Sequence, residues 1–290
     1  MKMNPVYKRE TMVTARSFRL ALTILTFNGV LALVALLNMY STLAQVRMTA
    51  EIQYGSFLDL YLFVAVLEFV MLIFIMPAIS AGSISGERER QTLDLMLTTQ
   101  MTPTDIVLGK LMASLSTMFL LIVSSFPIIG MVFVYGGVTM RDILILLTCF
   151  MVAGLFVGSL GLFCSAWFKK STLSAVVTYG VMGVIVFGTV GINLFTQYMG
   201  RTSMQRYVPV SNYLSLFQPS GSQQYLMLIN PAGTFLASIL NLTNHSVART
   251  SVSGWNIIQT NWIFASIIVQ LILAVLMIWG AIWAIERKKK

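Results

Sequence analysis

Six long apolar stretches constrain this chain more than any other feature of its sequence. Each is long enough to cross the ~30 Å hydrocarbon core of a bilayer as a helix. The stretches lie close to residues 20–43, 60–79, 111–135, 143–167, 173–195 and 262–285. Only 10% of the residues are charged, whereas a soluble domain carries about 25%. We therefore expect one all-α integral membrane domain with six transmembrane helices, covering residues 1–290.

The basic residues are distributed unevenly between the two sides that six crossings create. Fourteen of the 19 Lys and Arg residues fall on the side that carries both termini. They comprise five within residues 1–19, three within 83–110, two at 169–170 and four at 287–290. The positive-inside rule predicts a multi-pass protein of the cell (cytoplasmic) membrane with both termini cytoplasmic. The net charge of +9 then reflects topology and contact with the lipid bilayer, and no nucleic-acid partner is expected.

Residues 4–19 predict a short amphipathic helix that precedes the first span. Asn4 suits the N-cap and Pro5 the first helical position. The segment mixes basic with apolar side chains, as do helices that lie in the headgroup layer. The alternative is a disordered basic leader.

The segment at residues 197–261, between the last two spans, is expected to form an external cap. Within it, residues 226–240 are largely apolar, but they are too few for a span and are interrupted by Asn230 and Pro231. A seventh crossing would also place the basic C-terminus outside, against the positive-inside rule. We therefore predict a re-entrant or interfacial pair of short helices.

A cluster of charges lies between the second and third apolar stretches, in a loop at residues 83–105. The residue spacing predicts an amphipathic helix over Glu87–Thr99, which is too short to cross a membrane. Its apolar face carries Leu93, Met96 and Leu97. Arg90 and Asp94 have the i, i+4 spacing of a helical ion pair. Such a helix can dock a soluble partner; the alternative is a solvated loop with incidental charges.

A second helix is predicted to begin at Pro103 and to continue into the third span. Thr102 suits the N-cap, and Asp105 occupies the N3 position, where a carboxylate can bond back to the cap. A negative charge there also favours the N-terminal end of the helix dipole. The loop should therefore hold one short helix, a turn, and the start of the third span.

Residues 84–110 resemble the first cytoplasmic loop of the type 2 permeases of ATP-binding cassette (ABC) transporters, the exporter-like membrane subunits. That loop follows a pattern close to E-R-E-x-G-T-L-(D/E)-x-L-L, with a later G-K. The matching residues are Glu87, Arg88, Glu89, Thr92, Leu93, Asp94, Leu97, Thr98, Asp105, Ile106, Gly109 and Lys110. The start of the chain, Asn4–Glu10, is also similar to the opening of these permeases. Gln91 replaces the usual Gly, and Gln100 stands where the family often has Pro; Gln91 should make the helix more continuous.

In that family this loop holds the coupling helix, which sits in a groove of the nucleotide-binding subunit. The resemblance implies that an ABC ATPase subunit contacts the helix over Glu87–Thr99. The candidate contact residues are Glu87, Arg88, Glu89, Arg90, Thr92, Leu93, Asp94, Leu97, Thr98 and Thr99. It also implies a homodimer, or a heterodimer with a related permease.

The sequence contains no phosphate-binding motif of the Walker A type. Gly109 and Lys110 lack the upstream glycine and the following Ser or Thr that this motif needs. The chain is therefore not expected to be an enzyme or to bind a cofactor. ATP and Mg are expected on the partner subunit.

Glu68 lies near the middle of the second apolar stretch. A carboxylate at that depth costs ~2.5–3.5 kcal/mol on insertion scales, and it usually faces the interior of the bundle or a water-filled cavity. It is a candidate for the translocation path or for a proton relay. The alternative is a protonated side chain that hydrogen-bonds to a polar neighbour on another span, such as Asn28 or Asn38, and serves packing.

Several small residues are expected to let helices approach each other closely. They are Gly154 and Gly158 in the fourth stretch, and Gly180, Gly183, Gly188 and Gly191 in the fifth. Cys149 and Cys164 are predicted to be packing residues. The single His245 has no Cys or acidic cluster beside it, so no metal site is expected.

Together these features favour the membrane-spanning permease subunit of an ABC transporter, with export implied by the resemblance. One alternative is a membrane anchor or sensor that recruits a soluble partner through the same loop. Another is a proton-coupled secondary transporter that uses Glu68, although the sequence shows none of the internal repeats common in such transporters. The sequence does not identify the substrate.

Overall fold

The computed structural model describes residues 4–49, 55–98, 101–134, 140–202, 224–243 and 262–289, and all regular structure in these ranges is helical. Six runs in these ranges are long and apolar enough to cross a membrane. They are Phe18–Ser41, Tyr61–Glu89, Pro103–Gly130, Ile143–Trp167, Ser171–Phe195 and Trp262–Arg287. The all-α class with six candidate spans is therefore confirmed.

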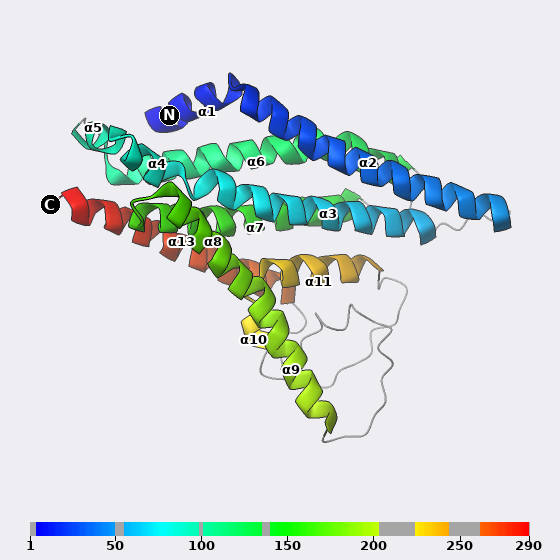
Figure 1. Ribbon diagram of the computed structural model, residues 1–290. Helices are drawn as coiled ribbons and strands as arrows, with labels where there is room; N and C mark the ends of the chain where they lie inside the picture. Colours follow the sequence, from blue (N-terminus) through cyan, green and yellow to red (C-terminus); the bar gives the residue numbers. More distant parts are fainter. Residues whose placement is uncertain are drawn as a thin grey trace.

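Five long helices form the bundle, and Figure 1 shows both ends of the described chain at the same end of it. These helices are α2 (Phe18–Thr49), α3 (Gly55–Ser80), α6 (Pro103–Val134), α7 (Met140–Trp167) and α13 (Trp262–Lys289). Helix α7 is central, because it contacts α3, α6 and α13 as well as shorter elements. The apolar side chains of Phe150, Phe156 and Val157 on α7 are almost fully buried.

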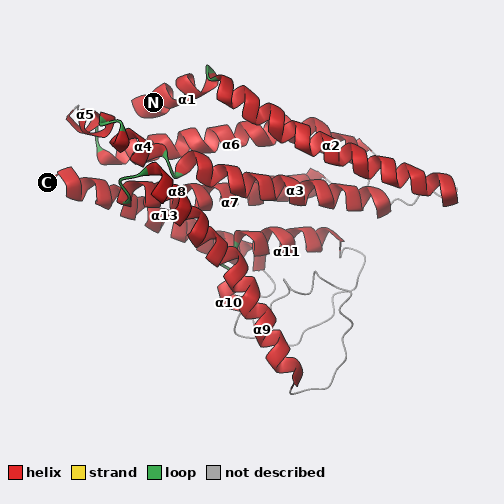
Figure 2. Cartoon of the chain, in the orientation of Figure 1, coloured by secondary structure: helices red, strands yellow, loops and turns green. Residues whose placement is uncertain are grey.

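Shorter elements surround this bundle, and Figure 2 shows several of the loops between helices gathered near its N-terminal end. They are α1 (Pro5–Ala15), α4 (Ser83–Glu89), α5 (Thr92–Thr98), α8 (Ser171–Gly183), the π-helix η1 (Val184–Gly188), α9 (Thr189–Thr202), α10 (Gln224–Met227) and α11 (Pro231–Thr243). The fifth apolar stretch is thus not one regular helix but the series α8, η1 and α9. Nothing in its hydropathy predicts the π-helix.

Helix α1 forms because Asn4 accepts a hydrogen bond from the backbone N–H of Val6 at 3.0 Å, with Pro5 in the first turn. It ends at Ala15, and α2 starts afresh at Phe18, so the amphipathic helix and the first span are separate elements. Val6 is buried against α6, where a Cβ added to Gly109 would lie 2.8 Å from the Cβ of Val6. This glycine allows α1 to pack directly on α6.

The glycines of α7 and those of the fifth stretch behave differently. A Cβ at Gly154 would lie 2.0 Å from the sulfur of Met118, so this glycine permits close helix packing as predicted. A Cβ at Gly180, Gly183 or Gly191 would meet no atom within 4 Å. The prediction that these three glycines bring helices together is therefore wrong within the described chain.

The apolar segment at residues 226–240 contains two short helices, separated at Asn230 as the sequence suggests. Asn230 caps α11, because its Oδ1 accepts from the N–H of Ala232 at 2.9 Å. Helix α11 packs on α7 and α13, and the ring of Phe235 stacks on that of Phe69 at 4.1 Å between centroids. This segment therefore contributes to the core of the bundle.

Candidate partner-docking site at the charged end

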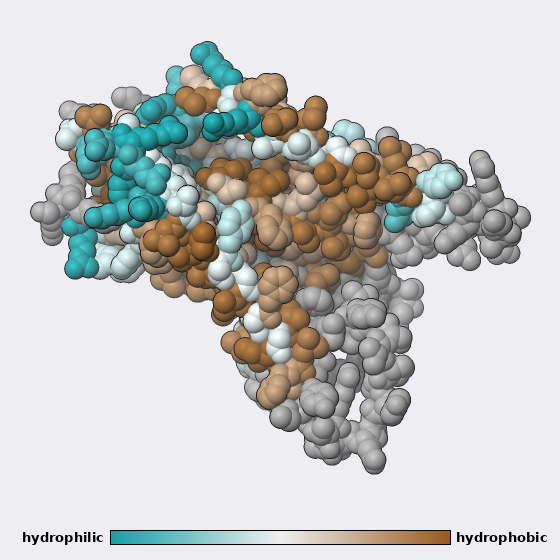
Figure 3. Space-filling model, viewed as in Figure 1, coloured by the Kyte–Doolittle hydropathy of each residue, from teal (hydrophilic) through white to brown (hydrophobic). Residues whose placement is uncertain are grey.

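Hydrophilic side chains gather at one end of the molecule, over α1 and α4, whereas the face beyond them is largely apolar (Figure 3). The predicted loop between the second and third spans lies at this end, with α4 following α3 and α5 preceding α6. The candidate site is built from α4, α5 and the elements that hold them.

The loop contains two short helices instead of the single helix predicted over Glu87–Thr99. Helix α4 ends at Glu89, α5 begins at Thr92, and Gln91 between them has a φ of 58°. This left-handed conformation costs a residue with a side chain about 1 kcal/mol or more. The prediction that Gln91 makes the helix more continuous is therefore wrong, because the chain keeps the bend that a glycine would favour.

The same bend removes the predicted helical ion pair. Arg90 follows the end of α4 and Asp94 lies in the first turn of α5, so the two residues no longer share one helix face. Both side chains are exposed.

The N-terminal end of α4 is capped by a residue far away in the sequence. Gly82 at the N-cap has no side chain to accept from the first N–H groups of the helix. The hydroxyl oxygen of Ser165 on α7 accepts instead from Ile84 N at 2.9 Å and Ser85 N at 2.8 Å. Because Ser165 is fully buried, this cap fixes α4 to the centre of the bundle.

The C-terminal end of α4 holds the turn between α7 and α8 through two adjacent residues. The guanidinium of Arg88 donates to the carbonyls of Ala166 and Phe168, each at 3.0 Å. The carboxylate of Glu89 accepts from the N–H of Ser171 at 2.9 Å and from its hydroxyl at 2.6 Å. The cation thus lies at the end of α7 and the anion at the start of α8, where each helix dipole favours that charge.

A buried lysine links α6 to α1 and α4. Lys110 is 3% exposed, and its Nζ lies 2.8 Å from Glu10 Oε1 and 3.5 Å from Glu87 Oε1. Glu87 also accepts a hydrogen bond from the hydroxyl of Thr92 on α5. This ion cluster was not predicted. The position of Lys110 beside the apolar third stretch could have indicated it, since a buried lysine needs an anionic partner.

Burial divides the predicted contact residues into two groups. Leu93 is 4% exposed and packs in a core cluster with Ile84 and Val107, so its side chain cannot reach a docked partner. Thr92, Leu97, Glu87 and Arg88 are half-buried. The exposed residues are Glu89, Arg90, Asp94 and Thr98, while Thr99 lies outside the described residues.

One exposed residue of this surface was missed from the sequence. Leu95 on α5 has 66% of its surface exposed, although it lies in the most polar part of the chain. Its neighbours Asp94 and Thr98 are exposed as well. An exposed leucine contributes favourable free energy when a partner buries it. The helical spacing of Leu93 and Leu97 indicates the opposite face of α5.

The start of α6 is fixed as its sequence predicts. The N–H of Asp105 donates to Thr102 Oγ1 at 3.2 Å, and the N–H of Thr102 donates to Asp105 Oδ2 at 3.3 Å. This reciprocal pair is a capping box with Asp in the place of Glu. The side-chain amide of Asn4 also donates to the carbonyl of Asp105 at 2.8 Å, which ties α1 to the same point.

Glu68 lies away from this site, inside the bundle, and is fully buried. Its Oε1 accepts from the hydroxyl of Ser125 on α6 at 2.5 Å. The partner is thus a polar residue of another span, as one alternative expects, although it is a serine and neither of the two asparagines named as examples. Asn28 donates instead to Ser124 at 2.9 Å. The adjacent Ser124 and Ser125 of α6 therefore hydrogen-bond to different helices, Ser124 to α2 and Ser125 to α3.

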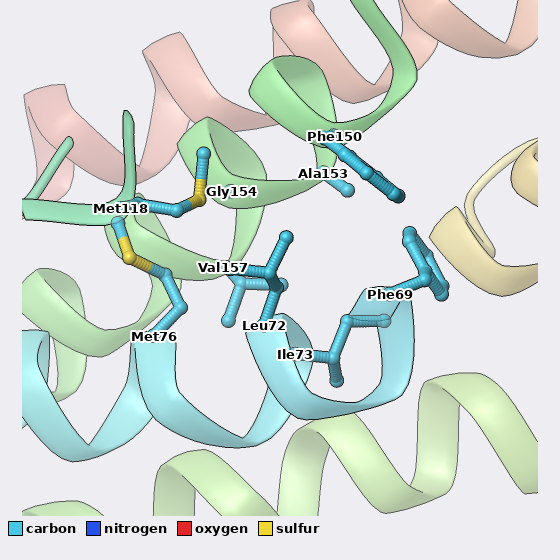
Figure 4. Close-up of a pocket in the computed structure, with 9 residues that line it drawn as sticks. All are labelled: Phe69, Leu72, Ile73, Met76, Met118, Phe150, Ala153, Gly154 and Val157. Carbon is cyan, nitrogen blue, oxygen red and sulfur yellow. The ribbon is translucent and has the colours of Figure 1, made fainter. Parts of the chain in front are cut away.

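A small cavity lies between α3, α6 and α7 (Figure 4). Its volume is about 10 Å³, about the size of one water molecule. It is lined by Phe69, Leu72, Ile73, Met76, Met118, Phe150, Ala153, Gly154 and Val157. All nine side chains are apolar or absent, so this cavity is a gap in packing and too small for a transported molecule.

The described residues contain no cluster of three or more His, Cys, Asp or Glu side chains that could hold a metal ion. The two cysteines, Cys149 and Cys164, are both buried and free. His245 lies outside the described residues. The chemistry of this end of the molecule is therefore that of an ion-paired protein surface.

Comparison with known proteins agrees with the geometry. A family model described as ABC-2 family transporter protein matches residues 28–283, which is most of the chain. No curated protein matches. With six candidate spans and a charged loop held between the second and third, the chain belongs to the ABC-2 family of transporter proteins and is a permease of an ABC transporter.

Proposed function

We propose that this permease exports its substrate with energy from a separate ABC ATPase subunit, which docks on the exposed face of α5 and on the α4–α5 turn. The observation that carries this proposal is the exposed Leu95 on a loop that is otherwise tied to four neighbouring elements. Export is supported by the resemblance of the loop to exporter-like permeases, and ATP with Mg is assigned to the partner.

The composition of this surface suits a protein contact. Protein interfaces are centred on a few large side chains that become desolvated, surrounded by a polar rim. Leu95 supplies such a side chain, and the exposed Arg90, Asp94 and Thr98 supply the rim. The opposite face of α5, with Leu93 and Met96, is buried in the permease and keeps the helix in place while the partner moves.

The contacts of α4 give a route for the movement. A force on α5 passes to Glu87 through Thr92, and from there to Lys110 on α6 and to Glu10 on α1. It also passes to the α7–α8 turn through Arg88 and Glu89. A rigid contact at one short loop can therefore tilt several spans at once, as alternating access requires.

The orientation and assembly follow the same proposal. Both termini and the docking surface are assigned to the cytoplasm, because most basic residues lie at that end. Two permease chains, identical or related, are expected to combine with their ATPases in the cell membrane. The resemblance supports this assembly.

The test is purification of the tagged chain in mild detergent from its native host, followed by mass spectrometry and an ATPase assay. We expect a soluble polypeptide with a Walker A motif to co-purify with ATP hydrolysis. The variant Leu95→Asp should reduce its recovery at least about tenfold, because burying a leucine side chain contributes about 1.5–3 kcal/mol. The control Met140→Asp changes another exposed side chain (68%) at the far end of α7, and should have no effect.

Other outcomes would favour the alternatives. Equal recovery with Leu95→Asp and with the unchanged chain would overturn the docking surface but not the ABC assignment. A folded chain that purifies alone, without ATPase activity, would favour the anchor or the proton-coupled transporter. Glu68→Gln would then separate these two, because only the proton-coupled reading requires that carboxyl group.

A further inference from the structure

One face of α13 carries a stripe of apolar side chains that ends in two tryptophans and an arginine. The members recur every three or four residues, so they lie on the same side of the helix. All of them are exposed, and they comprise Ile272, Leu276, Trp279, Trp283 and Arg287. The other side of α13, with Ala274 and Ala281, is fully buried and faces the bundle. The stripe therefore points away from the bundle.

The apolar part of this stripe has the length of one lipid leaflet. Ile272 lies near the middle of the candidate span Trp262–Arg287. From Ile272 to Trp283 the helix rises about 17 Å, and half of the ~30 Å hydrocarbon core is about 15 Å. Trp283 is thus placed at the membrane–water interface, where tryptophan is enriched. Arg287 lies one turn further along, at the level of the lipid headgroups.

A second tryptophan, at the end of α7, completes an aromatic cluster at this level. The ring centroids of Trp167 and Trp283 are 6.3 Å apart, and Phe163 lies 6.0 Å from Trp167. Phe163 packs over Gly280 of α13, where an added Cβ would lie 2.8 Å from its ring. The two tryptophans are 49% and 45% exposed. The cluster therefore joins α7 to α13 and still presents aromatic surface to the surroundings.

Two cations border the tryptophans. The guanidinium carbon of Arg287 lies 5.5 Å from the centroid of the Trp283 ring. A guanidinium on a ring face keeps N–H donors at its edge, and these fit two oxygens of a phosphate. Lys169 follows Trp167 by two residues and is exposed. The exposed carboxylate of Glu286 is about 100° around the helix from Arg287, outside the stripe.

The turn that carries Lys169 is held in place by α4. The hydrogen bonds of Arg88 and Glu89 fix the backbone before and after it. Its neighbour Lys170 interacts electrostatically with Glu89, so the cation of this turn nearest in sequence to the tryptophans is Lys169. A site whose parts are already ordered loses less affinity to ordering when a ligand binds.

We propose that the stripe, the two tryptophans and the cations Arg287 and Lys169 form a binding site for one anionic phospholipid. The anionic headgroup lies at the two cations, the glycerol region at Trp167 and Trp283, and an acyl chain along the apolar stripe. Basic sites between transmembrane helices bind anionic headgroups in this way. An anionic phospholipid matches both the apolar stripe and the positive charge beyond it, whereas an apolar helix of a second copy would match only the stripe. The proposal does not rest on the ATPase partner.

The test measures how brominated acyl chains quench tryptophan fluorescence in reconstituted bilayers. The permease, with Trp255→Phe and Trp262→Phe, is placed in phosphatidylcholine that contains an increasing fraction of brominated phosphatidylglycerol or of brominated phosphatidylcholine. Its emission then comes from Trp167, Trp279 and Trp283. We expect phosphatidylglycerol to reach half-maximal quenching at a fraction at least about fivefold lower, because a single cation near the headgroup contributes about that factor.

The decisive variant combines Arg287→Gln with Lys169→Gln and should bring the two quenching curves together. The matched control combines Arg16→Gln with Arg19→Gln. It removes the same charge from two exposed residues beside α1 and α2, across the bundle from α13 (Figure 1), and should leave the preference for phosphatidylglycerol unchanged. All four residues are exposed, so neither variant should unfold the chain.

Three results would overturn the site. Equal quenching by the two brominated lipids in the chain with both cations would show that it does not select an anionic headgroup. An equal loss of preference in the control variant would show that the attraction belongs to the net charge of the protein. Weak quenching by both lipids would show that something else, such as a second copy of the chain, covers the stripe.

Discussion

The charged end of this permease and its fifth span differ in how the rest of the chain contacts them. At the charged end, short polar elements are joined to α1, α6, α7 and α8 by ion pairs and helix caps. The fifth span is apolar and long, yet a π-helix interrupts it and the chain buries little of its most apolar window. Length and hydropathy therefore do not indicate how much of a membrane helix the rest of the chain covers.

The difference extends to how much of each span the chain itself covers. In α6 and α7, 56% of the most apolar window is buried, against 11% in the fifth span. Helices α6 and α7 are packed by other parts of the protein, whereas the fifth span faces the surroundings of the chain. Substitutions in the two regions should therefore differ in their free-energy effects as the regions differ in contacts.

The largest expected effect is the loss of the buried lysine at the charged end. Lys110→Met leaves Glu10 and Glu87 without their cation, and breaking a buried ion pair from one side costs about 3–5 kcal/mol. Thermal unfolding in detergent should show a large loss of stability. Lys169→Met, at an exposed lysine of the α7–α8 turn, should leave stability nearly unchanged.

A triple variant sharpens this prediction. Combining Lys110→Met with Glu10→Gln and Glu87→Gln removes the unpaired charges, and should recover much of the stability because uncharged replacements of buried ion clusters are often tolerated. If Lys110→Met unfolds at the same temperature as the unchanged chain, the ion cluster does not stabilise this end and the contrast with the fifth span fails.

Two glycines test the contrast in packing. A Cβ at Gly161 would lie 2.0 Å from Ser80 Oγ and 3.1 Å from the backbone nitrogen of Ala81, and a backbone atom cannot move aside easily. Gly161→Ala should destabilise the chain by about 1–3 kcal/mol. Gly180→Ala in the fifth span, where the added methyl meets nothing, should be neutral or stabilising by up to about 1 kcal/mol. Equal destabilisation by both would contradict the open packing of that span.

Much of the fold could be predicted because its signals are local. Hydropathy summed over a stretch located the six candidate spans, and the capping box of Thr102 and Asp105 fixed the start of α6. The break at Asn230 and Pro231 separated two short helices. In each case the residues that determine the feature lie within one or two turns of it.

The missed features depend on how distant helices are rotated against each other. The cap that Ser165 gives to α4, the contacts of Arg88, and the bond from Ser125 to Glu68 each join residues that are more than 50 positions apart. The prediction that Gln91 continues the helix was wrong for another reason. Helix propensity is weak, and the contacts on both sides of the bend outweigh it. The partner-contacting roles of the loop residues stay a prediction.

Arg88 tests whether α4 transmits movement to the α7–α8 turn. Arg88→Ala removes two charge-assisted hydrogen bonds to the end of α7 and should cost about 1–2 kcal/mol, because the guanidinium is only half-buried. If α4 acts as proposed, ATP hydrolysis by the purified complex should continue while transport falls. Arg90→Ala, at an exposed neighbour that directly follows α4, should be within about 0.5 kcal/mol of the unchanged chain and transport normally.

The smallest expected effect is a gain in stability at the bend of the charged end. Gln91 holds a φ of 58°, and a glycine adopts this conformation without the steric cost of a Cβ, so Gln91→Gly should stabilise the chain by up to about 1 kcal/mol. Arg90→Gly is the matched control, because Arg90 has an ordinary φ of −84° and glycine there should cost about 0.5–1 kcal/mol. Opposite signs at adjacent positions, measured as shifts in unfolding temperature, would show that the contacts around α4 and α5 impose the bend. A loss of stability in both variants would mean that Gln91 is not strained, and that the charged end is less tightly constrained than its hydrogen bonds indicate.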